Sequence, residues 1–387
     1  MNEPIGTTTN PSLLVLSRGH HPGVDGALAR LVSDGSLRTW QHEGIDHGQD
    51  AHTAEATWKR LAATITRNHT ELVVFHHYHS PALPDPRPFI ESLRATPHRP
   101  LIAFTGGDPF HGVSRPAHPQ VFKRASEAAD ITLNTSAGVA ADAITDYGAK
   151  LFALWPHSAC TVRFSKPKEP YRASESEFDV VFVGSNNKSR NPTNSFFWFS
   201  RQRERLVKTL DRKFGARLAV FGNGWEGLRS AQGPTPFDAQ IETCRRARVV
   251  VGGVPYSPAR YYTSNRPFIQ MMSGVPFVDI AVDGVETILR DGEHWHLVDS
   301  IDRVADRCDD LLARNNSELE ELGELAASYV AAHHMSTDRW RSLLRTLLGV
   351  RQSLLAGELP PQPDLSFFLP EVTIADELPL ATRGWVS

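Results

Sequence analysis

The sequence predicts an α/β protein. Two domains with mainly parallel sheets face each other across a cleft, and a helical C-terminal segment follows them. Three observations lead to this fold class. The chain has 387 residues, enough for two or three domains. Hydrophobic residues make up 40% and charged residues 22%, as in ordinary globular proteins. Short aliphatic runs alternate with helical patterns in two successive series, which is typical of parallel sheets.

The first series follows a polar N-terminus, residues 1–11, that we expect to be frayed or disordered. It forms an expected domain at 12–160. Its aliphatic runs have the length and composition of buried parallel strands, and they lie at 13–16, 72–75, 101–104, 131–134 and 151–154. Helices are expected at 27–32, 54–67, 121–128 and 136–147.

Residues 161–177 interrupt this rhythm with the stretch KPKEPYRASESE and are predicted to be an interdomain linker. The second domain is expected at 178–335, with strands at 180–184, 218–222, 249–252 and 276–279 and helices at 201–213, 239–247, 285–289, 304–314 and 317–332. An amphipathic helix at 336–357 carries four leucines on one face and is expected to pack across both domains. The proline-rich tail, 358–387, is expected to wrap the surface or to be disordered.

Composition excludes several classes of protein. A net charge of −3, from 41 basic and 44 acidic side chains, provides no field for non-specific nucleic-acid binding. No apolar run approaches the roughly 18–20 residues of a membrane-spanning helix, and a signal-peptide pattern is absent, so we expect a cytoplasmic protein. The three cysteines form no disulfide or C-x-x-C pattern. His77 and His79 could share a strand face, but no metal-ligand spacing supports them, and we expect no metal and no cofactor.

The loops at the strand ends are the first candidates for a site, because ligands of parallel sheets bind at the carboxyl ends of the strands. The loop from Gly184 to Asn191 is small, polar and basic, and Lys188 and Arg190 supply charge for an anion. A solvated loop would have the same composition.

A second strand ends in Gly222-Asn223-Gly224-Trp225-Glu226-Gly227, which spells G-x-G-x-x-G. A dinucleotide fingerprint must follow the first strand of its unit and open a helix. Here the motif follows the second strand, and Pro234 and Pro236 come soon after it. We interpret it as a Gly-rich turn in which Trp225 is available to border a nucleobase or sugar. A tight turn with a packed Trp225 is the alternative.

The stretch from Tyr261 to Val278 is the most informative. Ser264 is a good N-cap for a helix that starts at Asn265, and Gly274 is expected to end it in a C′ position. A helix N-terminus offers free N–H groups and partial positive charge, and Arg266 adds a bidentate cation there. These groups, with the hydroxyls of Ser264 and Tyr262, predict a receptor for a diphosphate. A plain N-cap, with Arg266 paired to a surface carboxylate, is the alternative.

These residues support a family resemblance. The run Tyr261–Gly274 and the phrases Gly284-Val285-Glu286 and Asp291-Gly292-Glu293-His294 resemble the C-terminal half of GT-B fold glycosyltransferases, closest to the spore-maturation-protein-like group and similar to the "group 1" enzymes. In the first half, residues 103–109 and 129–136 agree in outline. The resemblance covers roughly residues 12–350 and is specific only over about 260–300.

The resemblance implies two facing Rossmann-like domains and a metal-independent transfer of a sugar from a nucleoside diphosphate to an acceptor. It suggests UDP as the nucleotide and a role in bacterial glycan or natural-product biosynthesis. One departure is that the family often has Glu for the nucleotide ribose where this chain has Ile269; Gln270, Asp279 or Glu286 are possible substitutes. The expected donor-binding residues are Gly184, Asn186, Lys188, Arg190, Gly222, Asn223, Trp225, Tyr262, Ser264, Asn265, Arg266, Gln270 and Glu286.

The acceptor is expected to bind the first domain, near Gly107, Asp108, His77 and His79. The candidates for a base that activates or orients the acceptor hydroxyl are Asp108 first, His20 and His21 second, and His76, His77 and His79 third. Arg266 is expected to stabilise the leaving group. Two alternatives stay open: a sugar-nucleotide epimerase on the same fold, and a catalytically degenerate relative that binds nucleotide or glycan.

Overall fold

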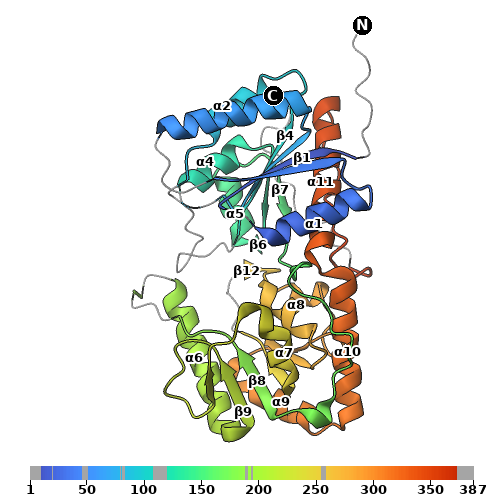
Figure 1. The fold of residues 1–387 in the computed structure, drawn as a ribbon. Coiled ribbons are helices and arrows are strands. Elements are labelled where there is room, and N and C mark those ends of the chain that lie inside the picture. Colours follow the sequence, from blue (N-terminus) through green and yellow to red (C-terminus); the bar gives the residue numbers. More distant parts are fainter. Residues whose placement is uncertain are drawn as a thin grey trace.

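The computed structural model describes residues 10–19, 21–45, 51–78, 80, 83–107, 120–187, 191–192, 195–253 and 259–372. Two sheets, one in each half of the chain, lie one above the other (Figure 1). The first has the strand order β2-β1-β3-β4-β5-β7, and all neighbouring strands are parallel. Its strands are β1 (Ser12–Ser17), β2 (Thr39–Gly44), β3 (Leu72–His76), β4 (Leu101–Thr105), β5 (Ile131–Asn134) and β7 (Phe152–Leu154).

The second sheet has the order β10-β9-β8-β11-β13-β14 and is also parallel throughout. Its strands are β8 (Phe178–Val183), β9 (Leu218–Phe221), β10 (Ala231–Gly233), β11 (Ala247–Val251), β13 (Phe277–Ile280) and β14 (His296–Val298). A small antiparallel pair, β6 (Ala137–Gly138) with β12 (Ala259–Arg260), joins the two halves. The predicted α/β class with two mainly parallel sheets is therefore confirmed.

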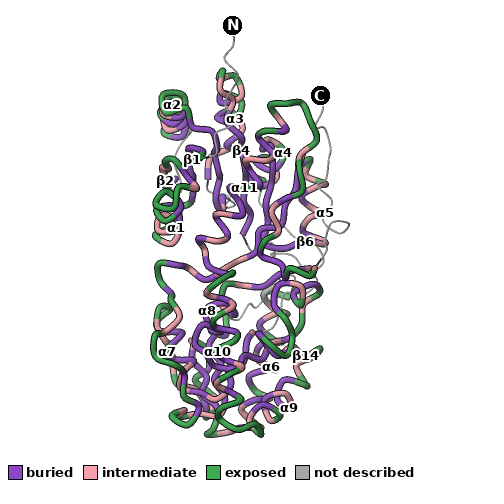
Figure 2. The backbone as a smooth tube through the Cα atoms, turned by 90° about the vertical axis from the view of Figure 1, so that its right-hand side faces the viewer, coloured by how far each residue is buried: buried purple, intermediate pink, exposed green. Residues whose placement is uncertain are grey.

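Helices cover both faces of the first sheet, because the side chains of a strand alternate between its faces. Leu13 and Val15 of β1 belong to a core that includes α1 and α11, whereas Leu14 and Leu16 belong to one that includes α2, α3 and α4. Figure 2 shows the buried strands enclosed by helices with exposed outer faces. In this half the helices are α1 (Pro22–Ser33), α2 (Ala51–Asn68), α3 (Arg87–Arg94), α4 (Gln120–Ala128) and α5 (Val139–Asp146).

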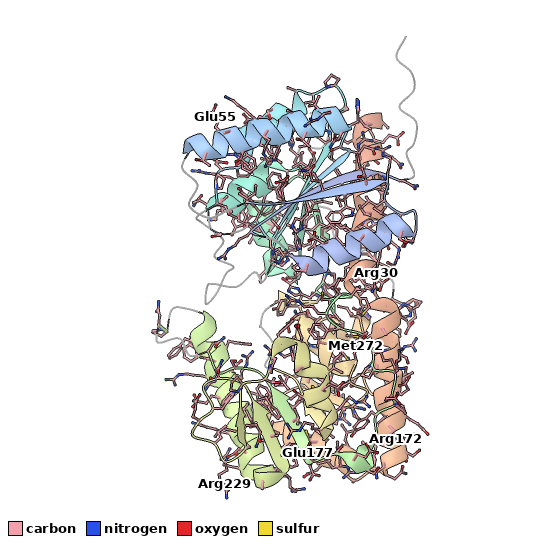
Figure 3. The ribbon with its side chains drawn as sticks, viewed as in Figure 1. Arg30, Glu55, Arg172, Glu177, Arg229 and Met272 are labelled. Atoms are coloured by element: carbon pink, nitrogen blue, oxygen red, sulfur yellow. The ribbon has the colours of Figure 1, made fainter. Side chains whose placement is uncertain are left out.

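The second half has α6 (Ser195–Phe214), α7 (Gln240–Arg245), α8 (Asn265–Met271), α9 (Ile301–Leu312) and α10 (Asn316–His333). Short 3₁₀ turns lie at Ala173–Glu175, Gly215–Arg217, Phe237–Ala239 and Val285–Thr287. The last of these stands where a helix at 285–289 was expected. Met272, at the end of α8, points into the interior of this half and is fully buried (Figure 3).

The C-terminal helix α11 (Ser336–Ala356) leaves the second half and packs against the first (Figure 1). Where it starts, the N–H of Thr337 donates to the Oγ1 of Thr161 at 3.1 Å. The indole N–H of Trp155 donates to the carbonyl of Arg339 at 2.9 Å. The chain then turns back, and Phe367 and Phe368 are buried in the core beside the second half. The N–H of Leu369 donates to the carbonyl of Thr287 at 2.8 Å, so the described part of the tail returns to the second half.

Candidate functional site

The loops that leave β8 and β9 touch each other through their backbones. A Cβ on Gly222 would stand 2.5 Å from the carbonyl oxygen of Gly184, and Gly222 has a φ of +143°. Beside this contact the N–H of Asn186 donates to the carbonyl of Asn223 at 2.8 Å. The two loops therefore form one layer at the carboxyl edge of the sheet, where a ligand of a parallel sheet binds.

Trp225 packs beneath the two loops, on the side of the protein interior. Its indole N–H donates to the Gly184 carbonyl at 2.7 Å, its ring packs edge-on to Phe182, and the side chain is only 3% exposed. A tryptophan that borders a ligand would show an open face. The structure therefore corrects the interpretation of Trp225 as a border for a base or sugar and favours the packed alternative.

Arg266, on the first turn of α8, points at the same layer. Its Nη1 lies 3.3 Å from the position that a Cβ would take on Gly184, and 3.4 Å from that position on Gly253. Gly184 follows β8 and Gly253 follows β11, so the guanidinium spans the ends of two adjacent strands. The missing side chains of both glycines leave room at this edge.

A second arginine, which the sequence did not single out, reaches the same place from α6. The Nη2 of Arg203 lies 3.7 Å from the Cβ position of Gly253, and its Nη1 donates to the carbonyl of Ser185 at 2.9 Å. The side chain is buried and packs over the ring of Phe199, 4.2 Å from its centroid. Two cations therefore converge on one glycine-lined edge. That arrangement suits an anion with two acceptor groups, such as a diphosphate.

Asp279, at the end of β13, lies beside these cations. Its carboxyl group would be within 2.7 Å of a Cβ on Gly252. Burial raises the pKa of this carboxyl to about 7, and the charges of Arg266 and Arg203 oppose the rise. A titratable group whose pKa lies near neutrality, next to a charged cluster at a sheet edge, is typical of a functional site.

The other predicted residues of this half lie in different positions. Ser264 is at the N-cap of α8, but its hydroxyl makes no capping bond, and α8 ends at Met271, three residues before Gly274 with its φ of +77°. Tyr262 is buried, with its ring against His157. Gln270 is buried, and its amide N–H donates to the Val183 carbonyl at 3.4 Å. Ile269 is buried in the core, and Glu286 is exposed.

Several predicted residues lie outside the part of the chain that the structure describes. They are Asp108, His20, His79, Lys188 and Arg190. Gly107 is described and buried, and its carbonyl accepts from the Oγ1 of Thr135 at 3.3 Å.

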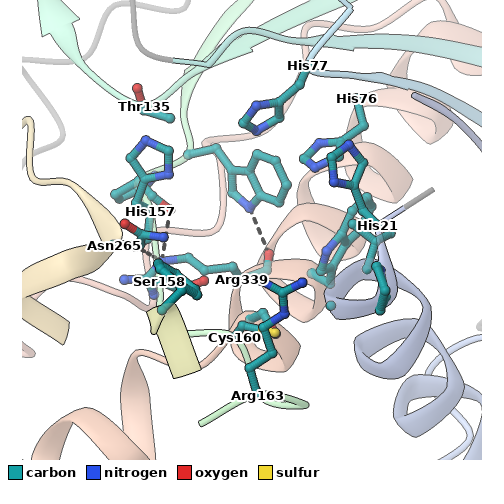
Figure 4. Close-up of a pocket in the computed structure, with 18 residues that line it drawn as sticks. His21, His76, His77, Thr135, His157, Ser158, Cys160, Arg163, Asn265 and Arg339 are labelled. Carbon is teal, nitrogen blue, oxygen red and sulfur yellow. Dashed lines mark hydrogen bonds between the residues drawn. The ribbon is translucent and has the colours of Figure 1, made fainter. Parts of the chain in front are cut away.

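A cavity of about 300 Å³ lies between the two halves, beside the start of α8 (Figure 4). Its wall brings together His21 and His77, predicted from the first half, with Asn265, predicted from the second. The segment after β7 supplies Trp155 and His157, the linker supplies Arg163, and α11 supplies Arg339 and Trp340, none of which the sequence singled out. Because Asn265 and Arg266 are consecutive, the cavity and the arginine-lined edge share the N-terminal turn of α8.

Histidines cluster at the upper wall of this cavity. The rings of His21 and His76 are 6.1 Å apart, and those of His76 and His77 are 4.2 Å apart. Burial holds the pKa of His76 well below its ordinary value, with a further contribution from His77 and the other nearby imidazoles. His76 is therefore neutral at physiological pH, and it exchanges a hydrogen bond with the Oγ1 of Thr105 at 3.1 Å.

A hydrogen-bonded chain supports the loop that carries His21. The Nε2 of His42 lies 2.6 Å from the Oγ of Ser17, and its Nδ1 lies 2.6 Å from Asp25. The spacing is that of a Ser-His-Asp triad, but Ser17 is fully buried, so its hydroxyl cannot reach a substrate. These hydrogen bonds between Ser17, His42 and Asp25 therefore position the start of α1.

Two features are absent from the described residues. Within the described ranges, no helix is long and apolar enough to cross a membrane. Across those same ranges, no group of three or more His, Cys, Asp or Glu side chains is arranged to hold a metal ion.

Comparison with known proteins agrees with this geometry. Residues 201–345 match a family model described as glycosyl transferase-like. No curated protein matches the chain. Among solved structures, a glycosyltransferase from Rickettsia africae has a TM-score of 0.56 at 13% identity, covering 89% of this chain and 99% of that one.

Two further structures share the architecture. Sucrose-phosphate synthase from Thermosynechococcus elongatus has a TM-score of 0.52 at 13% identity, covering 90% of this chain and 100% of its own. A UDP-forming α,α-trehalose-phosphate synthase from Burkholderia xenovorans has a TM-score of 0.52 at 11% identity, covering 88% of this chain and 98% of its own. At these identities the likeness shows the GT-B fold. The family match over residues 201–345 supports the resemblance to group 1 glycosyltransferases.

Proposed function

We propose that this chain transfers a sugar from a nucleoside-diphosphate sugar, with UDP as the nucleotide, to an acceptor held against the first half. The observation that carries the proposal is the convergence of Arg266 and Arg203 on the edge formed by Gly184 and Gly253. The UDP-forming trehalose-phosphate synthase, which shares the fold, supports the choice of nucleotide.

In the proposed reaction the acceptor hydroxyl attacks the anomeric carbon of the donor sugar. The bond between that carbon and the phosphate oxygen breaks, and its electron pair stays on the diphosphate. The two guanidinium groups are placed to stabilise this charge as it develops, which is often the largest contribution to catalysis. They would do so without a metal ion. The hydroxyl proton passes to a base of the first half, for which His21, at the wall of the cavity, is a candidate.

One observation favours a second function. Ile269 is fully buried, and Gln270 is bound to the Val183 carbonyl, so neither presents a polar group to a nucleotide ribose. A chain without ribose recognition could be a degenerate relative that binds nucleotide or glycan without turnover. Asp279 is the better candidate to replace the family's ribose-binding Glu, because it lies at the same sheet edge as Arg266.

The proposal is tested by incubating the full chain with a panel of UDP- and other nucleotide-linked sugars and following the products by mass spectrometry. Slow donor hydrolysis, or transfer to an acceptor from a mixed pool, is the expected result. Interconversion of the donor sugars would instead show an epimerase. Tight UDP binding without any turnover would show the degenerate relative.

A further inference from the structure

The cavity between the halves has an unbalanced wall. Two arginines, Arg163 and Arg339, supply its charge, and no Asp or Glu is among the described residues that line it. Clefts lined by charge of one sign concentrate the oppositely charged ligand. The wall of the cavity therefore favours an anion. Its positive charge is separate from that of Arg266 and Arg203 at the arginine-lined edge.

Arg339 gives this asymmetry a structural cause. Its side chain is only 2% exposed, yet its hydrogen bonds go to neutral acceptors: the carbonyls of Pro156, His157 and His333, and the Nδ1 of His334 at 2.6 Å. Asp338, its neighbour in sequence, pairs instead with Arg341 at 2.9 Å. Burial lowers the pKa of Arg339 to about 9, so the group keeps its charge at neutral pH. A buried cation that has no carboxylate partner among the described residues is costly unless a ligand supplies the counter-charge.

Arg163 supplies a second cation, which is exposed. It extends from the linker toward the group of side chains around His21 and Arg339 (Figure 4). Its nearest carboxylate is that of Asp238, at 4.0 Å and with both side chains largely exposed. Exposed pairs of this length contribute little. Arg163 can therefore turn from Asp238 to a bound anion at small cost.

Aromatic rings form another part of the wall. Trp155 and Trp340 pack edge-to-face with ring centroids 5.3 Å apart, and the ring of His76 lies against both. Phe237 closes the rim beside Arg163. Flat apolar rings with a few polar groups are suited to a ring compound. A volume of about 300 Å³ accommodates one such ring.

We propose that this cavity holds the acceptor, and that the acceptor is a small hydroxylated ring compound bearing a carboxylate or a phosphate. The anion would bind directly to Arg163, with the buried charge of Arg339 behind the wall. The anion would neutralise the wall, and the ring would lie beside Asn265, next to the sugar end of the donor. The name "acceptor" rests on the proposed function; the anion site itself does not.

Matched pairs of probes test the site by calorimetry or ligand-observed NMR. The carboxylate arm compares 4-hydroxybenzoate with 4-hydroxybenzamide, and the phosphate arm compares phenyl phosphate with phenol. We expect at least one anion to bind about tenfold or more tightly than its neutral partner, as a desolvated ionic contact provides. Equal affinities in both pairs, or no binding of either anion at 10 mM, would overturn the proposal.

Variants locate the site. Arg163→Gln should reduce the preference for the anion about fivefold or more, and Arg163→Lys should retain part of it. Lys168→Gln removes a charge from an exposed position of the same linker, outside the wall of the cavity, and should change nothing. Unchanged selectivity in Arg163→Gln, or an equal loss in Lys168→Gln, would contradict the assignment.

A competition separates this proposal from the donor site. Saturating UDP should leave the binding of the anionic probe in place, whereas displacement by UDP would put the probe in the donor site and overturn the inference. Arg266→Ala should weaken UDP and spare the probe. If UDP itself does not bind while the probe still does, the proposed function fails and the anion site stands.

Discussion

At the scale of single residues, Gly222 decides whether the candidate donor edge can form. A methyl group there would meet the Gly184 carbonyl at 2.5 Å and the Ser185 nitrogen at 2.8 Å, and the φ of +143° disfavours any side chain. We expect Gly222→Ala to cost about 2 kcal/mol or more in the free energy of unfolding, and to weaken UDP binding.

Chemical denaturation of the two variants Gly222→Ala and Gly227→Ala checks this. Gly227 belongs to the same G-x-G-x-x-G run, but its Cβ would meet nothing within 4 Å. Gly227→Ala should therefore unfold at nearly the denaturant concentration of the native chain. Similar losses in both variants would mean that the loop contact has no special part in stability.

Asp279 gives a prediction on pH. Its pKa lies at about 7, and a diphosphate bound to Arg266 and Arg203 would raise it further, because like charges favour the protonated carboxyl. Binding then takes up a proton, and UDP affinity falls as the pH rises above 7. Between pH 6.5 and 8 we expect the native chain to lose about three- to tenfold more affinity than Asp279→Asn.

Calorimetry in two buffers of different ionisation enthalpy measures the protons taken up directly. The comparison with Asp279→Asn removes the titration of UDP itself. Identical proton uptake in the two proteins would show that the carboxyl of Asp279 does not sense the nucleotide.

The sequence predicted which strand ends carry candidate site residues, but it did not predict which residues from other elements lie beside them. Arg266 was predicted because a cation at a helix start is visible in the sequence. The sequence analysis missed Arg203. This residue lies three residues before Leu206 and four before Val207, and therefore on the buried face of α6. Arg339 is likewise four residues before Leu343 in α11. An arginine on an apolar helical face was the available signal in both helices.

At the scale of elements, α10 fixes the end of α8 through a glycine. A Cβ on Gly323 would stand 1.7 Å from the carbonyl oxygen of Gly274. In an ordinary helix Gly→Ala stabilises by about 1 kcal/mol. Here the clash is with backbone, which cannot rotate away, so we expect Gly323→Ala to destabilise by about 2 kcal/mol or more.

Gly26→Ala in α1 is the matched control. Its Cβ would meet Val162, but that side chain is 52% exposed and free to change rotamer. Thermal unfolding should place Gly26→Ala within about 1 kcal/mol of the native chain. A stabilised Gly323→Ala would mean that α10 and α8 are not held in contact.

Strands with aliphatic runs were predictable, since LLVL in β1 is buried on both faces. The sequence analysis missed the edge strand β2. Its sequence, TWQHEG, has largely intermediate exposure and contains no buried aliphatic run that would predict a strand. The short strands β10 and β14, at three residues each, leave no periodic pattern. An edge strand forms because it pairs with a neighbouring strand that is distant in the sequence. That pairing cannot be predicted from the edge segment alone.

At the scale of the whole molecule, the tail joins the two halves. It runs beside α11, where the carbonyl of Asp364 accepts from Ser342 at 2.8 Å, and then places Phe368 against Tyr261 of the second half. Phe368→Ala should cost about 3 kcal/mol or more in unfolding free energy. Leu359→Ala, in the same tail but 70% exposed, should cost almost nothing. Equal effects on the denaturation midpoint would show that the tail does not anchor the halves.

The account as a whole depends on diphosphate recognition by Arg266 at the edge formed by Gly184 and Gly253. Calorimetry of UDP binding to Arg266→Ala tests it most directly, with Arg229→Ala as the control. Arg229 is an exposed arginine at the end of the second half farthest from the first (Figure 3). We expect Arg266→Ala to lose about tenfold to a hundredfold in affinity, the equivalent of a charged hydrogen bond, with unchanged thermal stability. UDP affinity that is equal in the native chain, Arg266→Ala and Arg229→Ala would contradict the account.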